Sequence, residues 1–155
     1  MKIFKLLPFV AVLGLTCTAP LASADTFVDA DDTVEYRQQA FSLIRDNFGI
    51  MAGMVRGEIT FDATQFQQHA DAVKHLAHIP LAGFSGAGEN VTKDSAALPK
   101  IWQNWDDFNS KMDDLVNAAA ELAEAAESGN IRTIAPKFIV TAGTCKQCHD
   151  NYKAD

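Results

Sequence analysis

Two cysteines and a histidine stand within five residues near the end of the chain, as Cys145-x-x-Cys148-His149. A C-x-x-C-H sequence is the attachment motif for c-type haem. Each thiol can form a thioether bond to one porphyrin vinyl group, and the histidine can place an imidazole nitrogen on the iron. We therefore expect one covalent haem c per chain, attached to Cys145 and Cys148 with His149 as the axial iron ligand.

Two other chemistries use closely spaced cysteines. A thioredoxin-like redox pair needs a βαβ context, which this chain lacks, and a zinc site needs a fourth ligand near the C-terminus. Both stay open as alternatives. A chance match to the full motif is improbable because the chain has only three cysteines.

Residues 1–24 have the pattern of a secretory signal peptide. Lys2 and Lys5 precede a short apolar run, and Ala22-Ser23-Ala24 fits a cleavage site. We expect cleavage of this signal, export to a bacterial periplasm and a single mature domain over residues 25–155. A lipid anchor on the third cysteine, Cys17, is the alternative, although its neighbours suit lipoprotein processing poorly.

The mature chain is short and acidic. About 131 residues suffice for one domain with one core, and removal of the two leader lysines changes the formal net charge from −7 to −9. An acidic chain binds nucleic acid and anionic membranes poorly. A redox partner protein would need a basic patch, although the charge can equally serve solubility alone.

Apolar residues recur at helical spacings of three, four and seven. They predict helices over residues 32–56, from 62 to Pro80, from Pro99 to Gly129, and from 133 onward. Capping boxes at 32–35 and 62–65 begin the first two helices. The connections at 57–61 and 128–132 are short, which implies antiparallel neighbours. The expected fold is all-α, an antiparallel up-down-up-down four-helix bundle, with residues 81–98 as a lid or crossover.

The last predicted helix directs its haem ligand into the bundle. Six residues share one face of this helix: Ile134, Phe138, Ala142, Cys145, His149 and Tyr152. In an antiparallel bundle, Met51 and Met54 would lie roughly 15–20 Å along the helix axis from the haem level. Met112 would also lie beyond it. His69 would lie below that level and His75 in solvent, so His78 remains the competing iron ligand.

A four-helix bundle that ends in C-x-x-C-H resembles the cytochrome c′ family. The likeness includes Tyr36-Arg37-Gln38, Pro80 with Phe84, and Ile101-Trp102, and it covers essentially the whole mature chain. It implies that Phe41 is the distal pocket residue, at the position where low-spin relatives carry a methionine ligand. The iron would then be five-coordinate, with a crowded apolar distal face.

The resemblance also assigns two cationic residues. Arg37 lies close to the apolar stripe, where an unpaired charge is costly, and it would bind a haem propionate. Lys153 stands four residues after the haem-binding histidine, where the family often has an arginine. Lysine keeps the charge on the proximal side but lacks the planar donor fork.

These features favour a high-spin cytochrome that binds small uncharged gases, above all nitric oxide, with carbon monoxide as a second ligand. We expect no enzymatic activity. A peroxidase needs a distal acid–base residue, and the distal residue predicted here is Phe41. Neither peroxidase nor nitric oxide reductase activity is therefore the favoured interpretation. The alternative function is a periplasmic electron carrier. That role suits an open iron less well, because a five-coordinate site reorganises more between oxidation states.

A second apolar stripe on the first predicted helix indicates a homodimer. Tyr36, Leu43, Ile50 and Met54 lie about 180–220° from Phe41 on a helical projection. A helix that is apolar on both sides is usually buried on both sides. The cytochrome c′ resemblance implies the same, since those proteins are often dimeric through their first two helices.

Overall fold

The structure is a computed structural model that describes residue 27, residues 29–84 and residues 91–154. Its helices, in chain order, are α1 (Ala30–Arg56), α2 (Ala63–Leu76), the 3₁₀ helix η1 (Pro80–Phe84), α3 (Lys100–Gln103), α4 (Trp105–Ala126) and α5 (Ile131–Tyr152). The described residues include no strand, and an isolated β-bridge joins Ala97 to Lys153.

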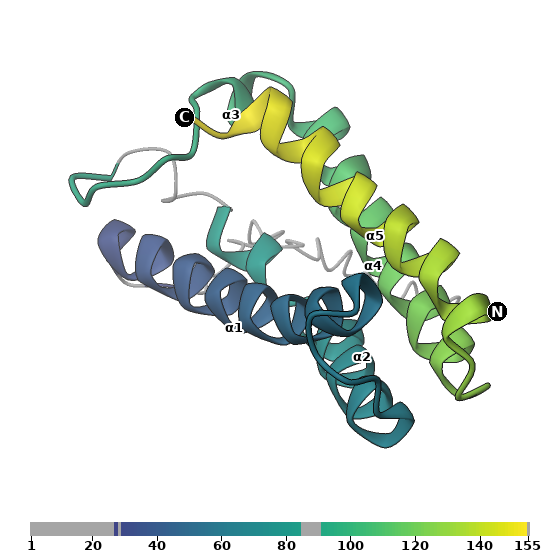
Figure 1. Ribbon diagram of the computed structural model, residues 1–155. Helices are drawn as coiled ribbons and strands as arrows, with labels where there is room; N and C mark the ends of the chain where they lie inside the picture. The colour runs from purple at the N-terminus through teal and green to yellow at the C-terminus, as the bar shows by residue number, and fades with distance from the viewer. Residues whose placement is uncertain (1–26, 28, 85–90, 155) are drawn as a thin grey trace, which may run out of the picture.

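The helices form two antiparallel pairs. α1 packs against α2, and α4 packs against α5. The two pairs are joined by contacts between α2 and α4, whereas α1 and α5 touch only locally. Figure 1 shows that the start of α1 and the end of α5 stand apart, with η1 between the two pairs. The bundle is therefore open at the end that carries the haem motif.

The caps of α1 differ from the predicted capping box. Asp29 is the N-cap and accepts a hydrogen bond from the Asp31 amide at 2.8 Å, so the helix begins two residues before Asp32. Asp31 and Asp32 lie in the first turn, where their charges favour the helix dipole. The other end was predicted correctly, because Gly57 terminates the helix with φ of 74°.

The N-cap of the second predicted box is confirmed, but the helix is shorter than expected. Asp62 caps α2 by accepting from the Gln65 amide at 2.9 Å. The helix ends at Leu76, and Pro80 begins η1 instead of closing α2.

The third predicted helix is interrupted. Asn104 takes φ −131° and ψ 49° between α3 and α4. Its backbone amide and its side-chain amide both donate to the Lys100 carbonyl at 3.1 Å, and these local bonds close the end of α3. Asparagine competes with the helix in this way through local side-chain bonds, so a continuous heptad pattern did not reveal the break.

α5 begins two residues before the predicted Thr133. Asn130 caps it, accepting from the Arg132 amide at 3.0 Å, and Pro136 consequently lies in the second turn. Proline has no amide to donate to the carbonyl of Arg132. Both residues are exposed, so water can satisfy that carbonyl.

The core has two parts. At the closed end, Phe66, Leu122 and Ile134 are fully buried, and Phe48 stacks on Phe138 with centroids 4.3 Å apart. At the open end, the buried residues of the second part are Phe84, Ile101, Phe108, Met112 and Tyr152. No helix in the described ranges is long and apolar enough to cross a membrane.

Met54 belongs to this core, which corrects the predicted outer stripe. Its side chain is 3% exposed and packs with the closed-end cluster. Met54 lies near the C-terminal end of α1. At that end the closed-end core covers the side of the helix that stands about 220° from Phe41. Tyr36, Leu43 and Ile50 remain exposed, at 36%, 52% and 37%.

Candidate functional site

A cavity of about 760 Å³ lies at the open end of the bundle, between α1, α4 and α5. Its wall is mainly apolar and includes Phe41, Phe48, Phe84, Phe108, Met112 and Leu115. The cavity follows from the fold, because the helix pairs diverge here and no side chain fills the gap. Such a slot suits a flat apolar group.

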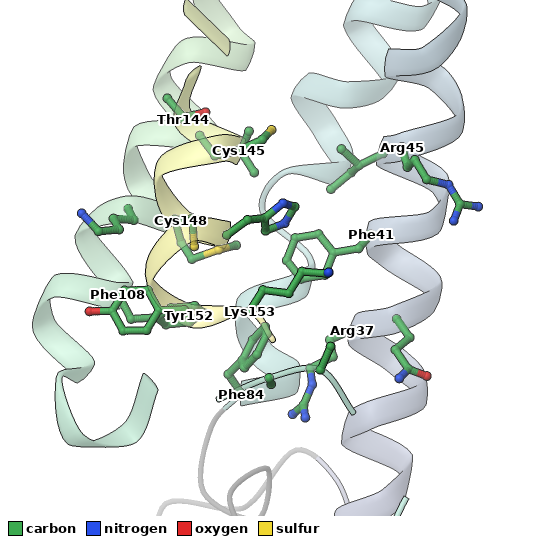
Figure 2. Close-up of a pocket in the computed structure, with 18 of the residues that line it drawn as sticks. Arg37, Phe41, Arg45, Phe84, Phe108, Thr144, Cys145, Cys148, Tyr152 and Lys153 are labelled. Atoms are coloured by element: carbon green, nitrogen blue, oxygen red, sulfur yellow. The ribbon is translucent and has the colours of Figure 1, made fainter. Parts of the chain in front are cut away.

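The three residues of the C-x-x-C-H motif line this cavity together. Cys145, Cys148 and His149 stand at spacings of three and four on α5, which places them on one face. Figure 2 shows the two thiols directed from α5 toward the space in front of α1. Both cysteines are half-buried and form no disulfide.

The protonation states argue against a reactive thiolate pair and fit iron binding by the histidine. Burial raises the pKa of the Cys145 thiol and raises that of Cys148 to about 11, so neither is a ready thiolate nucleophile. Burial, helped by the positive charge of Lys153, lowers the pKa of His149. A neutral imidazole keeps the lone pair that a metal needs. Among the described residues no group of three histidines, cysteines or carboxylates could form a separate metal site.

Phe41 forms the wall opposite the cysteines. It projects from α1 toward α5 (Figure 2) and makes an edge-to-face contact with Phe84, with centroids 6.2 Å apart. A phenyl ring can neither bind iron nor donate a hydrogen bond to a ligand. The position assigned to Phe41 by resemblance is therefore in the cavity wall.

The competing ligands lie elsewhere, with one exception. His78 is exposed and does not line the cavity, and His69 pairs with Asn47 at 2.8 Å. Met51 is buried in the closed-end core. Met112 lines the cavity, whereas the sequence placed it beyond the haem; it belongs to α4 and packs in the same cluster as Phe108.

Arg37 is buried in the cavity wall with partners that the sequence did not indicate. It is 2% exposed and donates to the Gly83 carbonyl at 2.6 Å and to the Ser95 hydroxyl at 3.1 Å. Its guanidinium also lies 4.6 Å from the centroid of the Phe84 ring. Burial lowers the pKa of this group, although an arginine stays protonated at neutral pH. The site therefore has a fixed positive charge at its rim.

Lys153 follows the last residue of α5. It is exposed, and its ammonium group donates to the Ala154 carbonyl at 3.1 Å. Figure 2 shows its side chain reaching from the end of α5 across the cavity toward Phe41.

The sequence predicted residues 81–98 as a lid or crossover but did not indicate its contacts; part of this segment bridges the two walls of the cavity. We call residues 92–98 the strap. Its Thr92 and Lys93 amides each donate to Asp31 of α1 at 2.9 Å. At its other end, the Leu98 amide donates to the Tyr152 carbonyl at 3.0 Å, and the Ala154 amide donates to the Ala96 carbonyl at 2.8 Å. These contacts join residues more than 50 positions apart, and no local pattern announces them.

The residues present fit a covalently attached haem. Two thiols and a neutral imidazole share one wall, apolar side chains can cover the porphyrin faces, and the Arg37 guanidinium can meet an acidic substituent. The sequence model of the cytochrome c′ family matches residues 32–153. The chain belongs to the cytochrome c′ family.

Relatives cover almost the whole fold of this cytochrome c′ chain. The cytochrome c′ of Rubrivivax gelatinosus is 34% identical over 82% of this chain and 98% of the relative. A solved cytochrome c prime from Shewanella frigidimarina is 45% identical, with a TM-score of 0.78 over 83% of this chain and 99% of that one. Variants of Alcaligenes xylosoxidans cytochrome c prime, solved with nitric oxide and with carbon monoxide, are each 32% identical with TM-scores of 0.75, over 83% of this chain and 98% and 99% of theirs.

These matches confirm two expectations. The fold is the predicted up-down-up-down four-helix bundle of cytochromes c′. Cytochromes c′ carry covalently attached haem c, so the predicted cofactor is confirmed as well.

Proposed function

We propose that this cytochrome c′ binds small uncharged gases at a five-coordinate haem iron, with nitric oxide as its main ligand. Cys145 and Cys148 hold the haem through thioether bonds, and His149 provides the protein's axial bond to iron. The observation that carries the proposal is the wall facing these residues, where Phe41 stands and cannot bind iron. The haem itself supplies the metal that binds the gas.

The chemistry of the wall favours nitric oxide. An apolar face accepts an uncharged diatomic molecule without loss of solvation, whereas bound O₂ would find no hydrogen-bond donor on Phe41. Nitric oxide binds haem iron strongly without such help. Relatives of the same fold have been solved with nitric oxide and with carbon monoxide, which supports the same ligand class for this chain.

We assign two of the cationic residues that line the cavity, Arg37 and Lys153, to the haem. Arg37 would add a propionate to its present partners through charge-assisted hydrogen bonds. The Lys153 side chain would turn away from Phe41 to lie on the proximal side near His149, where its charge already lowers the pKa of that imidazole.

Residues 1–24 lie outside the residues that the structure describes, so their role is argued from their sequence alone. Their pattern supports cleavage as a signal peptide, export to the periplasm and a single mature domain over residues 25–155. Covalent haem attachment after export agrees with this, because two free thiols would otherwise be oxidised in such a compartment.

Electron transfer is the second candidate function. It is favoured by the partly open cavity, which would leave a haem edge accessible to a redox partner protein. We rank it below gas binding because an iron without a sixth ligand reorganises more on reduction. An enzymatic role ranks lower still, since the wall formed by Phe41 offers no proton donor.

Titration of the ferrous protein with nitric oxide tests the function. We expect one nitric oxide molecule per haem and complete saturation near stoichiometric concentrations, because no protein ligand must be displaced. Carbon monoxide should bind at the same site. The measurement is the change in the visible spectrum, and a ferrous spectrum that neither gas alters would leave electron transfer as the function.

We also propose a homodimer through α1. Tyr36, Leu43 and Ile50 form an exposed apolar stripe with a spacing of seven residues. Tyr36 extends this surface by packing against Phe27, with centroids 4.9 Å apart. A self-complementary stripe of this kind suits an isologous contact between two copies of α1.

A further inference from the structure

His149 lies close to the end of its helix. α5 ends at Tyr152, three residues after His149, and the last turn of a helix frays easily because its carbonyls lack helical donors. On one side α5 packs against α4, but on the other the cavity separates this turn from α1. The turn that carries the iron ligand therefore depends on anchors outside the helix.

Tyr152 provides the first anchor through its side chain. The ring is 4% exposed and packs edge-to-face against Phe108, with centroids 5.4 Å apart. Its hydroxyl donates to a carboxylate oxygen of Asp107, in the first turn of α4, at 2.5 Å. A hydrogen bond to a carboxylate is charge-assisted and stronger than a neutral one. It links the end of α5 to the start of α4.

The strap provides the second anchor through the backbone. The Leu98 amide donates to the Tyr152 carbonyl at 3.0 Å, which supplies one of the donors that the helix end lacks. Tyr152 is thus held by its side chain and by its carbonyl on two different segments. Figure 2 shows its ring beside Phe108, next to Cys148.

The other polar side chains of this turn bond only locally. Lys146 pairs with Asp150 within α5, and the Asn151 amide donates to the Gln147 carbonyl of the same helix. Within the described residues, Tyr152 is the residue of this turn whose side chain hydrogen-bonds to another helix. The side-chain hydrogen bonding between this turn and α4 therefore depends on a single hydroxyl group.

We propose that Tyr152 is a positioning residue for His149. Its hydrogen bond to Asp107 holds the last turn of α5 so that the imidazole stays directed at the iron when a gas binds on the Phe41 side. A diatomic ligand on the Phe41 side would compete with His149 for the iron, so retention of the histidine would depend on how firmly the protein holds it. This inference rests on the proposed gas-binding function.

Tyr152→Phe tests the inference in the haem-loaded protein, because it removes the hydroxyl and keeps the ring. Two quantities are measured: the iron–histidine stretching frequency of the ferrous protein by resonance Raman, and the rate at which the nitric oxide complex loses His149. We expect a lower frequency and release that is roughly tenfold faster, since a tenfold change is about 1.4 kcal/mol and hydrogen bonds to charged groups have that order of strength.

Two further variants sharpen the test. Asp107→Asn removes the charge that Tyr152 contacts and should shift both quantities in the same direction. Lys146→Gln breaks the exposed ion pair with Asp150 in the same stretch of helix without touching α4, and it should behave as the parent does. Thermal unfolding of each variant separates positioning from a general loss of stability.

The inference is overturned if Tyr152→Phe keeps the parent frequency and release rate while only its melting temperature falls. An equal shift in Lys146→Gln would overturn it too, because any loosening of the turn would then suffice. If the parent ferrous protein shows no iron–histidine stretch of a five-coordinate site, the proposed function fails and this inference fails with it. If the parent shows this stretch and Tyr152→Phe shows it at the same frequency, the positioning inference fails and the proposed function stands.

Discussion

Replacement of Phe41 by alanine is expected to accelerate carbon monoxide binding by roughly a hundredfold. The ring stands on α1 opposite the haem-binding residues of α5 and would crowd any ligand approaching the iron from that side. If the crowding contributes about 3 kcal/mol to the barrier, its removal changes the rate by that factor, because each factor of ten corresponds to about 1.4 kcal/mol. The measurement is flash photolysis or stopped-flow mixing of the ferrous variant with carbon monoxide.

Phe48→Ala is the matched control for Phe41→Ala. Phe48 lies on the same helix and lines the same cavity, but two turns further from the haem motif, where it stacks on Phe138. It should lose comparable stability and retain the parent association rate. Replacing a fully buried phenylalanine with alanine lowers the free energy of unfolding by roughly 3–5 kcal/mol. Phe41 is only half-buried, so the loss should be smaller and Phe41→Ala should still fold. Equal rates in the parent and in Phe41→Ala would show that Phe41 fills the core without gating the iron.

The double substitution Leu43→Glu and Ile50→Glu is expected to convert a dimer into a monomer that retains its haem spectrum. Both side chains are exposed on α1 and point away from the cavity. A twofold contact would place four carboxylates in one apolar interface, and burial of unpaired charges is costly. Sedimentation velocity at tens of micromolar protein measures the change.

A second pair of exposed apolar residues serves as the control for the dimer. Ile139 and Val140 of α5 are 66% and 53% exposed, more than any residue of the α1 stripe. Ile139→Glu with Val140→Glu should leave the dimer intact, because exposure alone does not create an interface. A parent protein that sediments as a monomer would contradict the proposed contact, and loss of the dimer in the α5 variant would place the interface elsewhere.

The haem motif and the core faces could be predicted because their information is local. Cys145, Cys148 and His149 share a face at any helical geometry, and the apolar spacings of α1, α2 and α5 identify the sides that the bundle buries. The caps at Asp62 and Gly57 depend on residues only a few positions away. These features required no knowledge of distant contacts.

Other features depend on contacts between distant segments, and the sequence pattern does not contain them. Met54 has the same helical phase as Tyr36, yet its position along α1 brings it into the closed-end core while Tyr36 stays exposed. The neutral partners of Arg37 come from Gly83 and Ser95, which fold back over α1. The bond from Tyr152 to Asp107 spans 45 residues. Each depends on tertiary packing that a periodic pattern leaves open.

The central claim is that His149 is the only protein ligand on the iron and that the face toward Phe41 is free to bind gas. The most direct test is the optical spectrum of the purified ferrous protein at neutral pH without added ligand, supported by an EPR spectrum of the ferric form. A five-coordinate iron should give high-spin spectra without a sharp low-spin α band. A six-coordinate low-spin spectrum would contradict it and would direct attention to Met112 or His78 as a second ligand.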